Sequence, residues 1–407
     1  MHVKDGSKLR TLTSEIGLNI ACDAYRFHSF AESVRQLVFA CRAAGLPIVI
    51  NDMQPHPQLR SLYRQLFRGQ FDSSLDEYVS RRNHFPINLI RFNPAHTEKL
   101  FASNQQYFAG KVNVAMWSWE LPKIPSNWVP LFGRFDEVWV LSEFIKQIFS
   151  IASTVPIRKI TLPLYIDEAS LDPEVFRRRF GDETRVFLFA FESQSGFEIK
   201  NPLALVEAFS RAFTKSDKAL LIIKTMPFSV NPVNAMDSVK RNLENSRRLK
   251  KAVNGASRNA NIALINGHFT RAQFFSLLAS SDCYVSLHRA EGYGQVLAQS
   301  MYLGKPVIAT GYSGNLEFMN EKNSLLVRYD LVDVDPRDGY YRPQVEGNVW
   351  AEPDIDEASR LMRWVYEHRN GADELGKAAS KSMRESSNPM MVGEEIRQNC
   401  VRLLSTH

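Results

Sequence analysis

The segment that decides the fold is DCYVSLHRAEGYGQVLAQSMYLGKPVIATGYSGNLEFM, residues 282–319. Its first seven residues are typical of a buried strand, a glycine-rich turn follows, and a helix is expected over 295–303. Gly292 and Gly294 allow the backbone to approach a ligand closely, and the helix start presents N–H groups without helical partners. A phosphate or diphosphate would fit there. The same glycines could serve the turn sterically, so this pattern alone leaves ligand binding open.

The rest of the chain repeats this alternation of short apolar runs and helix-length segments. Runs rich in Val, Ile and Leu are typical of parallel strands buried by crossover helices. One helix is expected over 29–45, with a capping box at Ser29 and Glu32 and a stop at Gly45, and another over 201–215. The sequence therefore predicts an α/β protein with doubly wound parallel sheets in two successive halves. The predicted strands are 17–22, 46–52, 86–92, 111–117, 136–142, 155–163, 185–191, 219–225, 261–268, 282–288 and 305–311.

A change in composition separates the two halves. Residues 166–184 are polar and charged, and we interpret them as a linker with room for one short helix. Residues 53–84 are polar and rich in Arg, which predicts irregular structure. The predicted organisation is a first domain over 1–165, the linker 166–184, a second domain over 185–385 and a final helical segment over 386–407.

Composition and charge indicate a soluble globular protein. The chain has 407 residues, of which 44% are hydrophobic and 23% charged, with a net charge of +6. Its four cysteines lie far apart, which favours buried thiols in a reducing compartment over disulfides or structural zinc. The first 25 residues lack a signal-peptide pattern, and no run approaches about 18 apolar residues. We expect a cytoplasmic protein. The cysteines are Cys22, Cys41, Cys283 and Cys400.

The longer pattern around Glu291 resembles the retaining glycosyltransferases of family 4. Their signature is a Glu, a Gly-aromatic-Gly turn and a second Glu eight positions after the first, followed by a segment similar to GKPVIATGYSGNLEFM (304–319). Residues 185–203, RVFLFAFESQSGFEIKNPL, look like the family segment that carries a phosphate-binding lysine, which falls at Lys200. Residues 111–142 look like the acceptor-domain segment of a bacterial polysaccharide subgroup. The resemblance implies the GT-B fold, with two Rossmann-like domains that face each other across a cleft.

The resemblance also implies roles for individual residues. Glu291 would hold the donor sugar, and Lys200 would stabilise the departing diphosphate, where negative charge builds up. The alternative for Lys200 is a solvated residue at a helix start, where a cation is poorly placed. The donor-binding residues would further include the start of the predicted helix and two serines of the preceding loop: Gly292, Tyr293, Gly294, Gln295, Ser193 and Ser195.

Two departures from the family pattern concern the donor site. Gln299 replaces the second Glu, so the hydrogen bonds that it accepts from ribose hydroxyls would lose charge assistance. The Arg that often accompanies the lysine is missing between Arg185 and Lys200. Lys224 or Arg289 could help to hold the phosphates instead.

Several further residues have both a functional and a structural interpretation. Trp119 and Glu120 follow a predicted strand and could bind an acceptor, or they could be a core tryptophan and a surface carboxylate. His28 lies in the first strand-to-helix loop and could approach phosphate or acceptor, or cap the helix. His288 precedes Arg289 at a strand end and could contact the donor.

Metal, membrane and nucleic-acid binding receive less support. Two Asp-x-Asp matches, at 333–335 and 354–356, lie in sequence typical of loops, and Asp354 or Asp356 more plausibly caps a helix. We expect no metal and no cofactor beyond the nucleotide sugar itself. Basic runs at 177–179 and 240–251 could dock onto anionic lipid, or could be solvated helix faces. Nucleic-acid binding is not expected, because no stripe of stacking aromatic residues accompanies the charge.

The expected function is a metal-independent, retaining hexosyltransferase. It would move a mannose-like or glucose-like sugar from a nucleotide sugar to a saccharide or lipid-linked acceptor in surface polysaccharide synthesis. The final segment would cross back to the first domain, as in other GT-B proteins. Two alternatives stay open: a catalytically silent GT-B subunit that binds nucleotide sugar or a partner glycosyltransferase, motivated by Gln299, and a phosphorylase-like or epimerase enzyme on the same fold.

Overall fold

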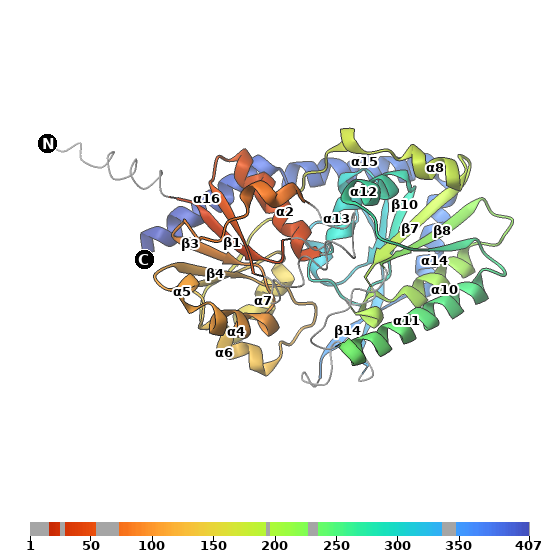
Figure 1. The fold of residues 1–407 in the computed structure, drawn as a ribbon. Helices are drawn as coiled ribbons and strands as arrows, with labels where there is room; N and C mark the ends of the chain where they lie inside the picture. Colours follow the sequence, from red (N-terminus) through yellow and green to blue (C-terminus); the bar gives the residue numbers. More distant parts are fainter. Residues whose placement is uncertain are drawn as a thin grey trace. The chain divides into compact units, whose positions relative to one another are not determined.

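The chain forms two compact units in the computed structural model (Figure 1). The structure describes residues 16–24, 29–53, 73–192, 196–226, 235–335 and 347–406. Unit 1 comprises Met1–Trp119, Ile124–Tyr165 and Ser386–His407, and unit 2 comprises Glu120–Lys123 and Ile166–Glu385.

Unit 1 contains a six-stranded parallel sheet in the order β2-β1-β3-β4-β5-β6. Four of its strands are buried along their whole length, as expected for apolar runs covered on both faces. The strand order reverses between β1 and β3, which makes the sheet doubly wound. The strands are β1 (Leu18–Cys22), β2 (Ile48–Asp52), β3 (Ile87–Ile90), β4 (Val112–Met116), β5 (Glu137–Val140) and β6 (Ile157–Lys159).

Helices cover the sheet of unit 1, and the C-terminal helix α16 (Pro389–Thr406) packs against α2 (Ser29–Ala43). The two backbones approach closely, because a Cβ on Gly393 would lie 2.0 Å from the carbonyl oxygen of Ala40. Arg402 of α16 also donates at 2.7 Å to the buried carboxylate of Glu137. The other helices of unit 1 are the 3-10 helices η1 (Ser73–Tyr78) and η2 (Ser126–Trp128), and α4 (Pro94–Ser103), α5 (Gln105–Phe108), α6 (Val129–Phe132) and α7 (Glu143–Ala152).

Unit 2 contains a second six-stranded parallel sheet, in the order β12-β11-β10-β7-β8-β9. Counted along this unit the order is 3-2-1-4-5-6 read from β9, the Rossmann order, and it reverses between β7 and β10. A separate antiparallel pair joins β13 to β14. The strands are β7 (Arg185–Phe191), β8 (Ala219–Thr225), β9 (Ile262–Asn266), β10 (Cys283–Ser286), β11 (Val307–Thr310), β12 (Leu325–Val327), β13 (Tyr329–Asp333) and β14 (Val349–Pro353).

Helices also cover the sheet of unit 2. In Figure 1, α10 (Pro202–Ala212) and α11 (Ala235–Ala256) lie on the opposite side of this sheet from α12 (Arg271–Ser280) and α13 (Gln295–Tyr302). Its remaining helices are η3 (Glu168–Ser170), α8 (Glu174–Phe180), α9 (Phe197–Lys200), η5 (Ser313–Glu317), α14 (Ile355–Glu367) and α15 (Arg369–Ser386).

The two doubly wound parallel sheets confirm the predicted fold class. Residues 166–184, interpreted from sequence as a linker, pack with unit 2, where Arg177 of α8 lies 2.9 Å from Asp282. The loop-like interpretation of the sequence around Asp333 was wrong, because this residue ends β13, paired with Val349 of β14. Asp354 caps α14 by accepting a hydrogen bond from the Glu357 N–H at 2.9 Å, as predicted.

The part of residues 53–84 that the structure describes contains some regular secondary structure. It contains η1 and an isolated parallel bridge between Val79 and Ile50, so the expectation of irregular structure was wrong for 73–79. The four cysteines are free and buried, as expected. Within the described part of the chain, no helix combines the length and the apolar character needed to cross a bilayer.

Candidate functional site

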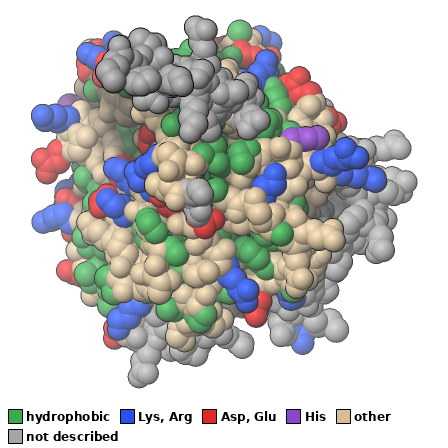
Figure 2. All heavy atoms as spheres, turned by 90° about the vertical axis from the view of Figure 1, so that its left-hand side faces the viewer, with side chains coloured by type: hydrophobic (Ala, Val, Ile, Leu, Met, Phe, Trp, Pro, Cys, Tyr) green, Lys and Arg blue, Asp and Glu red, His purple; other side chains and the backbone are tan. Residues whose placement is uncertain are grey.

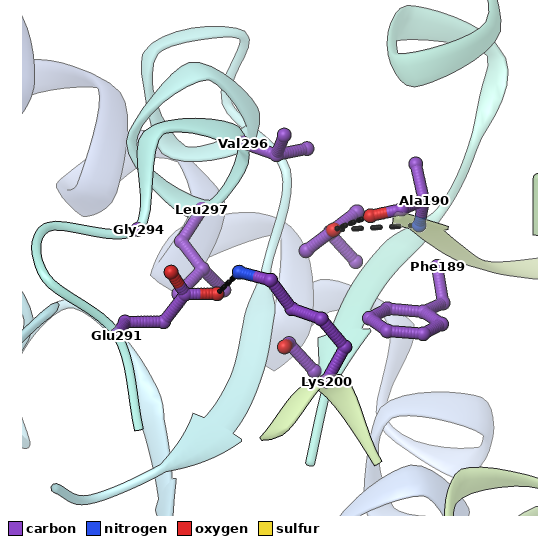
Figure 3. Close-up of a pocket in the computed structure, with 9 residues that line it drawn as sticks. Phe189, Ala190, Lys200, Glu291, Gly294, Val296 and Leu297 are labelled. Carbon is purple, nitrogen blue, oxygen red and sulfur yellow. Dashed lines mark hydrogen bonds and ion pairs between the residues drawn. The ribbon is translucent and has the colours of Figure 1, made fainter. Parts of the chain in front are cut away.

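A small cavity of about 50 Å³ lies in unit 2, at the ends of β7 and β10 (Figure 3). These neighbouring strands are the ones between which the strand order reverses. In open α/β sheets, ligands bind at the carboxyl ends of the strands at such a switch point. The cavity is lined by Phe189, Ala190, Lys200, Tyr284, Ser286, Glu291, Gly294, Val296 and Leu297.

Lys200 and Glu291 form an ion pair that lines this cavity. Figure 3 shows the two side chains reaching toward each other, with the Lys200 amine against the Glu291 carboxylate. Both are mostly buried, with side chains 21% and 14% exposed. Lys200 lies in the last turn of α9 rather than at a helix start, so its charge suits the local helix end. The structure thus brings the two predicted catalytic residues together.

The backbone of Glu291 is held by the turn at Ser313 and Gly314. The Glu291 N–H donates to the Ser313 hydroxyl at 2.8 Å, and its carbonyl oxygen accepts from the Gly314 N–H at 2.8 Å. This approach requires a glycine, because a Cβ at Gly314 would lie 2.1 Å from the Gly292 carbonyl oxygen. The glycine-rich turn is therefore clamped in place before helix α13 begins.

Helix α13 begins directly after this turn, at Gln295. Its N-cap residue, Gly294, has φ +85°, a left-handed conformation that favours glycine. Gly294 has no side chain to cap the helix, and the first N–H groups of a helix have no partners within the helix. The Gln295 Nε2 is buried and has no hydrogen-bond partner among the described residues. This helix start can accept an anionic group.

Two other predicted donor residues lie on the same segment but point into packed surroundings. The Tyr293 ring, 8% exposed, packs against Phe318 with ring centroids 5.0 Å apart. Gln299 is 3% exposed and lies in the middle of α13. Their contact with a donor stays a prediction.

His288 is fully buried between two polar side chains. Its Nε2 lies 3.1 Å from Asn315 Oδ1, and its Nδ1 lies 3.1 Å from the Ser286 hydroxyl. Desolvation by burial lowers the pKa of His288, which favours the neutral ring. A neutral ring can donate to Asn315 and accept from Ser286. His288 thus joins a cavity-lining strand to the turn that holds Glu291, and its contact with a donor stays a prediction.

The two cations proposed to assist Lys200 both bind other protein groups. Lys224 is 3% exposed, and its amine donates to the carbonyl oxygens of Thr225 and Gly267 at 2.8 and 2.6 Å. Desolvation lowers the pKa of Lys224 to about 8. Arg289 donates to Glu352 at 2.6 Å and to the Glu198 carbonyl oxygen at 2.9 Å.

Sequence reasoning missed two polar residues of the cavity, Tyr284 and Ser286. The Tyr284 hydroxyl donates to the Ala190 carbonyl oxygen at 3.1 Å and so ties β10 to β7. Desolvation by burial raises the pKa of Tyr284, which keeps this donor protonated. Tyr284 and Ser286 alternate along β10, and His288 follows at the same spacing just beyond the end of the strand. In a strand, this period of two places side chains on one face. That alternation was the available signal.

The predicted acceptor residues belong to different environments. Trp119 is 7% exposed and packs against Trp128, with ring centroids 4.7 Å apart. Glu120 is the next residue in the chain and belongs to unit 2. His28 lies outside the described residues, as do the predicted donor residues Ser193 and Ser195.

The described residues offer no evident metal centre, since they contain no group of three or more His, Cys, Asp and Glu side chains that could hold an ion. The basic runs are partly used within the fold. Arg177 pairs with Asp282, and Arg248 pairs with Glu198.

Comparison with known proteins places the cavity within a matched segment. Residues 198–334 match the family model described as Glycosyl transferases group 1. This segment contains both Lys200 and Glu291. No curated protein sequence matches the chain.

Solved structures match nearly the whole chain at low sequence identity. The structure of Anabaena HepE in complex with UDP and glucose is 13% identical, with a TM-score of 0.63, and the match covers 96% of this chain and 100% of that one. Sucrose-phosphate synthase from Thermosynechococcus elongatus is 15% identical, with a TM-score of 0.64 and the same coverage. A glycosyltransferase from Rickettsia africae is 14% identical, with a TM-score of 0.62, covering 97% and 100%. These matches show that the chain has the two-domain, Rossmann-like GT-B fold.

Proposed function

We propose that this protein is a retaining glycosyltransferase, related to family 4, that transfers a hexose from a nucleotide sugar to a saccharide or lipid-linked saccharide. The observation that carries the proposal is the Lys200–Glu291 pair at the switch point between β7 and β10. The pair lies inside the segment that matches the group 1 glycosyltransferase model. The HepE structure, which holds UDP and glucose on a similar fold, supports a nucleotide-sugar ligand.

The proposed chemistry uses the two charges for different parts of the donor. The Lys200 ammonium stabilises the diphosphate as the bond between the anomeric carbon and the phosphate oxygen breaks. The N–H groups at the start of α13, with Gly292 and Gly294 in the preceding turn, face the same phosphates. Glu291 accepts hydrogen bonds from hydroxyls of the sugar and so orients it.

The acceptor hydroxyl then bonds to the anomeric carbon, and its proton passes to an oxygen of the departing diphosphate. No separate catalytic base is required in this scheme. Lys200 and the helix start together provide positive charge for the leaving group, so we propose that transfer needs no metal ion or other cofactor. A mannose-like or glucose-like donor and a surface-polysaccharide acceptor are the proposed substrates.

The test is turnover of nucleotide sugars by the purified protein, with and without a mixture of saccharides and with EDTA present. We expect nucleoside diphosphate release that requires added saccharide, and a product whose anomeric proton signal in NMR shows the configuration of the donor. Glu291→Ala should abolish this transfer while the protein still melts cooperatively. Turnover without saccharide, or transfer by Glu291→Ala at a near-normal rate, would contradict the proposal.

A silent subunit is the second candidate, and Gln299 is the observation that favours it. An amide at this position accepts hydrogen bonds without the charge assistance of the carboxylate in the family pattern. A silent subunit would bind nucleotide sugar without turnover, and Gln299→Glu would restore none. Saccharide-dependent turnover by the unsubstituted protein would exclude this candidate.

We also propose peripheral binding to anionic membranes in the cytoplasm, through unit 1 rather than through the basic runs at 177–179 and 240–251, which belong to unit 2. The net charge of +6 falls entirely in unit 1, because unit 2 contains equal numbers of basic and acidic residues. Figure 2 shows Lys and Arg side chains scattered over one face of the molecule, among acidic and hydrophobic side chains. Sedimentation with phosphatidylglycerol vesicles, but not with phosphatidylcholine vesicles, should carry the protein down at low salt. Equal sedimentation with both would contradict this.

A further inference from the structure

We infer that Arg289 is a positioning residue that sets the place of the Lys200 amine at the cavity by holding the backbone of α9. This inference rests on the proposed function, because it concerns how the donor site is assembled. Arg289 lies two residues before Glu291, and α9 ends at Lys200. It therefore links the two segments that carry the ion pair.

The contacts of Arg289 with α9 involve two successive carbonyl groups. The Arg289 backbone N–H donates to the Ile199 carbonyl oxygen at 2.7 Å. Its side-chain Nη1 donates to the Glu198 carbonyl oxygen at 2.9 Å and lies 3.4 Å from the Glu198 carboxylate. Both carbonyls belong to the residues immediately before Lys200, so they fix the backbone from which its side chain extends.

The sequence of α9 explains why an external donor is needed there. In a continuing helix, the carbonyl of Glu198 would accept from the N–H of residue 202. That residue is Pro202, which has no N–H. Asn201 also turns the chain with φ 51°, a left-handed conformation that ends α9 after a single turn. The Arg289 guanidinium replaces the missing donor, and its positive charge suits the C-terminal end of this short helix.

A second set of contacts anchors Arg289 itself. Its Nε donates to the Glu352 carboxylate at 2.6 Å, and its guanidinium lies 5.0 Å from the Trp350 ring centroid. The Arg289 carbonyl oxygen accepts from the Ala351 N–H at 2.9 Å. All three partners belong to β14, so this strand anchors both the guanidinium and the backbone of Arg289. With a side chain 17% exposed, Arg289 has a defined orientation.

Glu198 receives a second cation, because Arg248 of α11 pairs with its carboxylate. The Arg248 guanidinium also lies 5.0 Å from the Phe197 ring centroid. Glu198 is thus bound both by Arg248 of α11 and by Arg289. The short helix α9 owes its position to these arginines, and Arg289 is the one that also belongs to the segment of Glu291.

The test is a double-mutant cycle read by calorimetric binding of uridine diphosphate and guanosine diphosphate. The variants are Arg289→Ala, Lys200→Ala and the double variant. If Arg289 acts through Lys200, then Arg289→Ala should weaken binding at least tenfold when Lys200 is present and less than twofold in the Lys200→Ala background. An equal factor in both backgrounds, or no loss in the first, would overturn the inference.

Arg177→Ala is the matched control. Arg177 is similarly buried, with a side chain 19% exposed, and pairs with Asp282 at 2.9 Å in the same unit. It should lower the melting temperature and change the affinity by less than twofold. If Arg289→Ala does not fold, Arg289→Lys replaces it in the cycle, because a single ammonium cannot reproduce the several bonds of the guanidinium. We then expect a three- to tenfold loss of nucleotide affinity when Lys200 is present, and a smaller loss in the Lys200→Ala background. Failure of the unsubstituted protein to bind either nucleotide would overturn the proposed function itself, and this role with it.

Discussion

The Glu291 carboxylate is bound directly to the Lys200 amine, so each charge neutralises the other at the cavity. A nucleoside diphosphate that binds Lys200 must therefore displace Glu291. A nucleotide sugar can compensate, because its hydroxyls give the carboxylate new donors, whereas a nucleoside diphosphate without sugar cannot. Under the proposed function, the pair would therefore discriminate between the donor and its nucleoside diphosphate product.

The first prediction concerns Glu291→Gln. Removal of the carboxylate frees Lys200, so uridine or guanosine diphosphate should bind about three- to tenfold more tightly, equivalent to about 0.7–1.4 kcal/mol. Isothermal titration calorimetry measures the change. Asp217→Asn is the control, because Asp217 pairs with Arg363 at 2.7 Å elsewhere in unit 2. Weaker binding by Glu291→Gln would refute the competition between carboxylate and phosphate.

A second prediction concerns the turn that holds Glu291. Gly314→Ala places a Cβ 2.1 Å from the Gly292 carbonyl oxygen, so the turn must shift. We expect a loss of about 1–3 kcal/mol in the free energy of unfolding, and weaker nucleotide binding. Gly255→Ala is the control, because nothing lies within 4 Å of the added Cβ, and it should be neutral or stabilising by up to about 1 kcal/mol. Equal stability of the two variants in urea denaturation would contradict the close approach.

The parallel sheets could be predicted from sequence because their strands are continuous apolar runs. β7, for example, is RVFLFAF, and six of its seven residues are buried. The pair β13–β14 was missed because every residue of β13 is exposed and the strand carries Asp330 and Asp333. An exposed strand between acidic residues has the composition of a loop, and only its pairing with β14 distinguishes it.

The candidate site was predictable in its residues but not in its contacts. A lysine and a glutamate could be singled out by resemblance to a family. Their ion pair joins residues 91 positions apart and exists because β7 and β10 are neighbours in the sheet. Strand order is set by packing over the whole unit, which no local pattern encodes. The hydrogen bonds from Arg289 to α9 could not be predicted for the same reason.

The third prediction concerns the buried amine of Lys224. Its pKa of about 8 in the fold is below the value of about 10.4 in an unfolded chain, so between these values the unfolded chain binds more protons. Stability should therefore rise with pH in this window. Relative to Lys224→Met, the protein should gain about 1 kcal/mol in the free energy of unfolding between pH 7 and pH 9. A constant difference between the two proteins across this range would show that the amine titrates normally.

The fourth prediction concerns Gln299→Glu. The side chain at this position is 3% exposed, so burial should raise the pKa of the new carboxyl group, and the folded state should hold its proton more tightly than the unfolded chain. The free energy of unfolding of the variant, relative to that of the unsubstituted protein, should therefore fall by about 1–3 kcal/mol as pH rises from about 4 to 8. Thermal denaturation at several pH values measures the loss. A pH-independent difference would indicate a carboxylate that reaches water.

The most direct test of the account is calorimetric binding of a panel of nucleoside diphosphates and nucleotide sugars to the unsubstituted protein and to Lys200→Ala. We expect at least one nucleotide to bind, and Lys200→Ala to weaken its binding at least tenfold while both proteins melt cooperatively. Equal binding by the two proteins, or no binding of any nucleotide to the unsubstituted protein, would contradict the assignment of this cavity as the donor site.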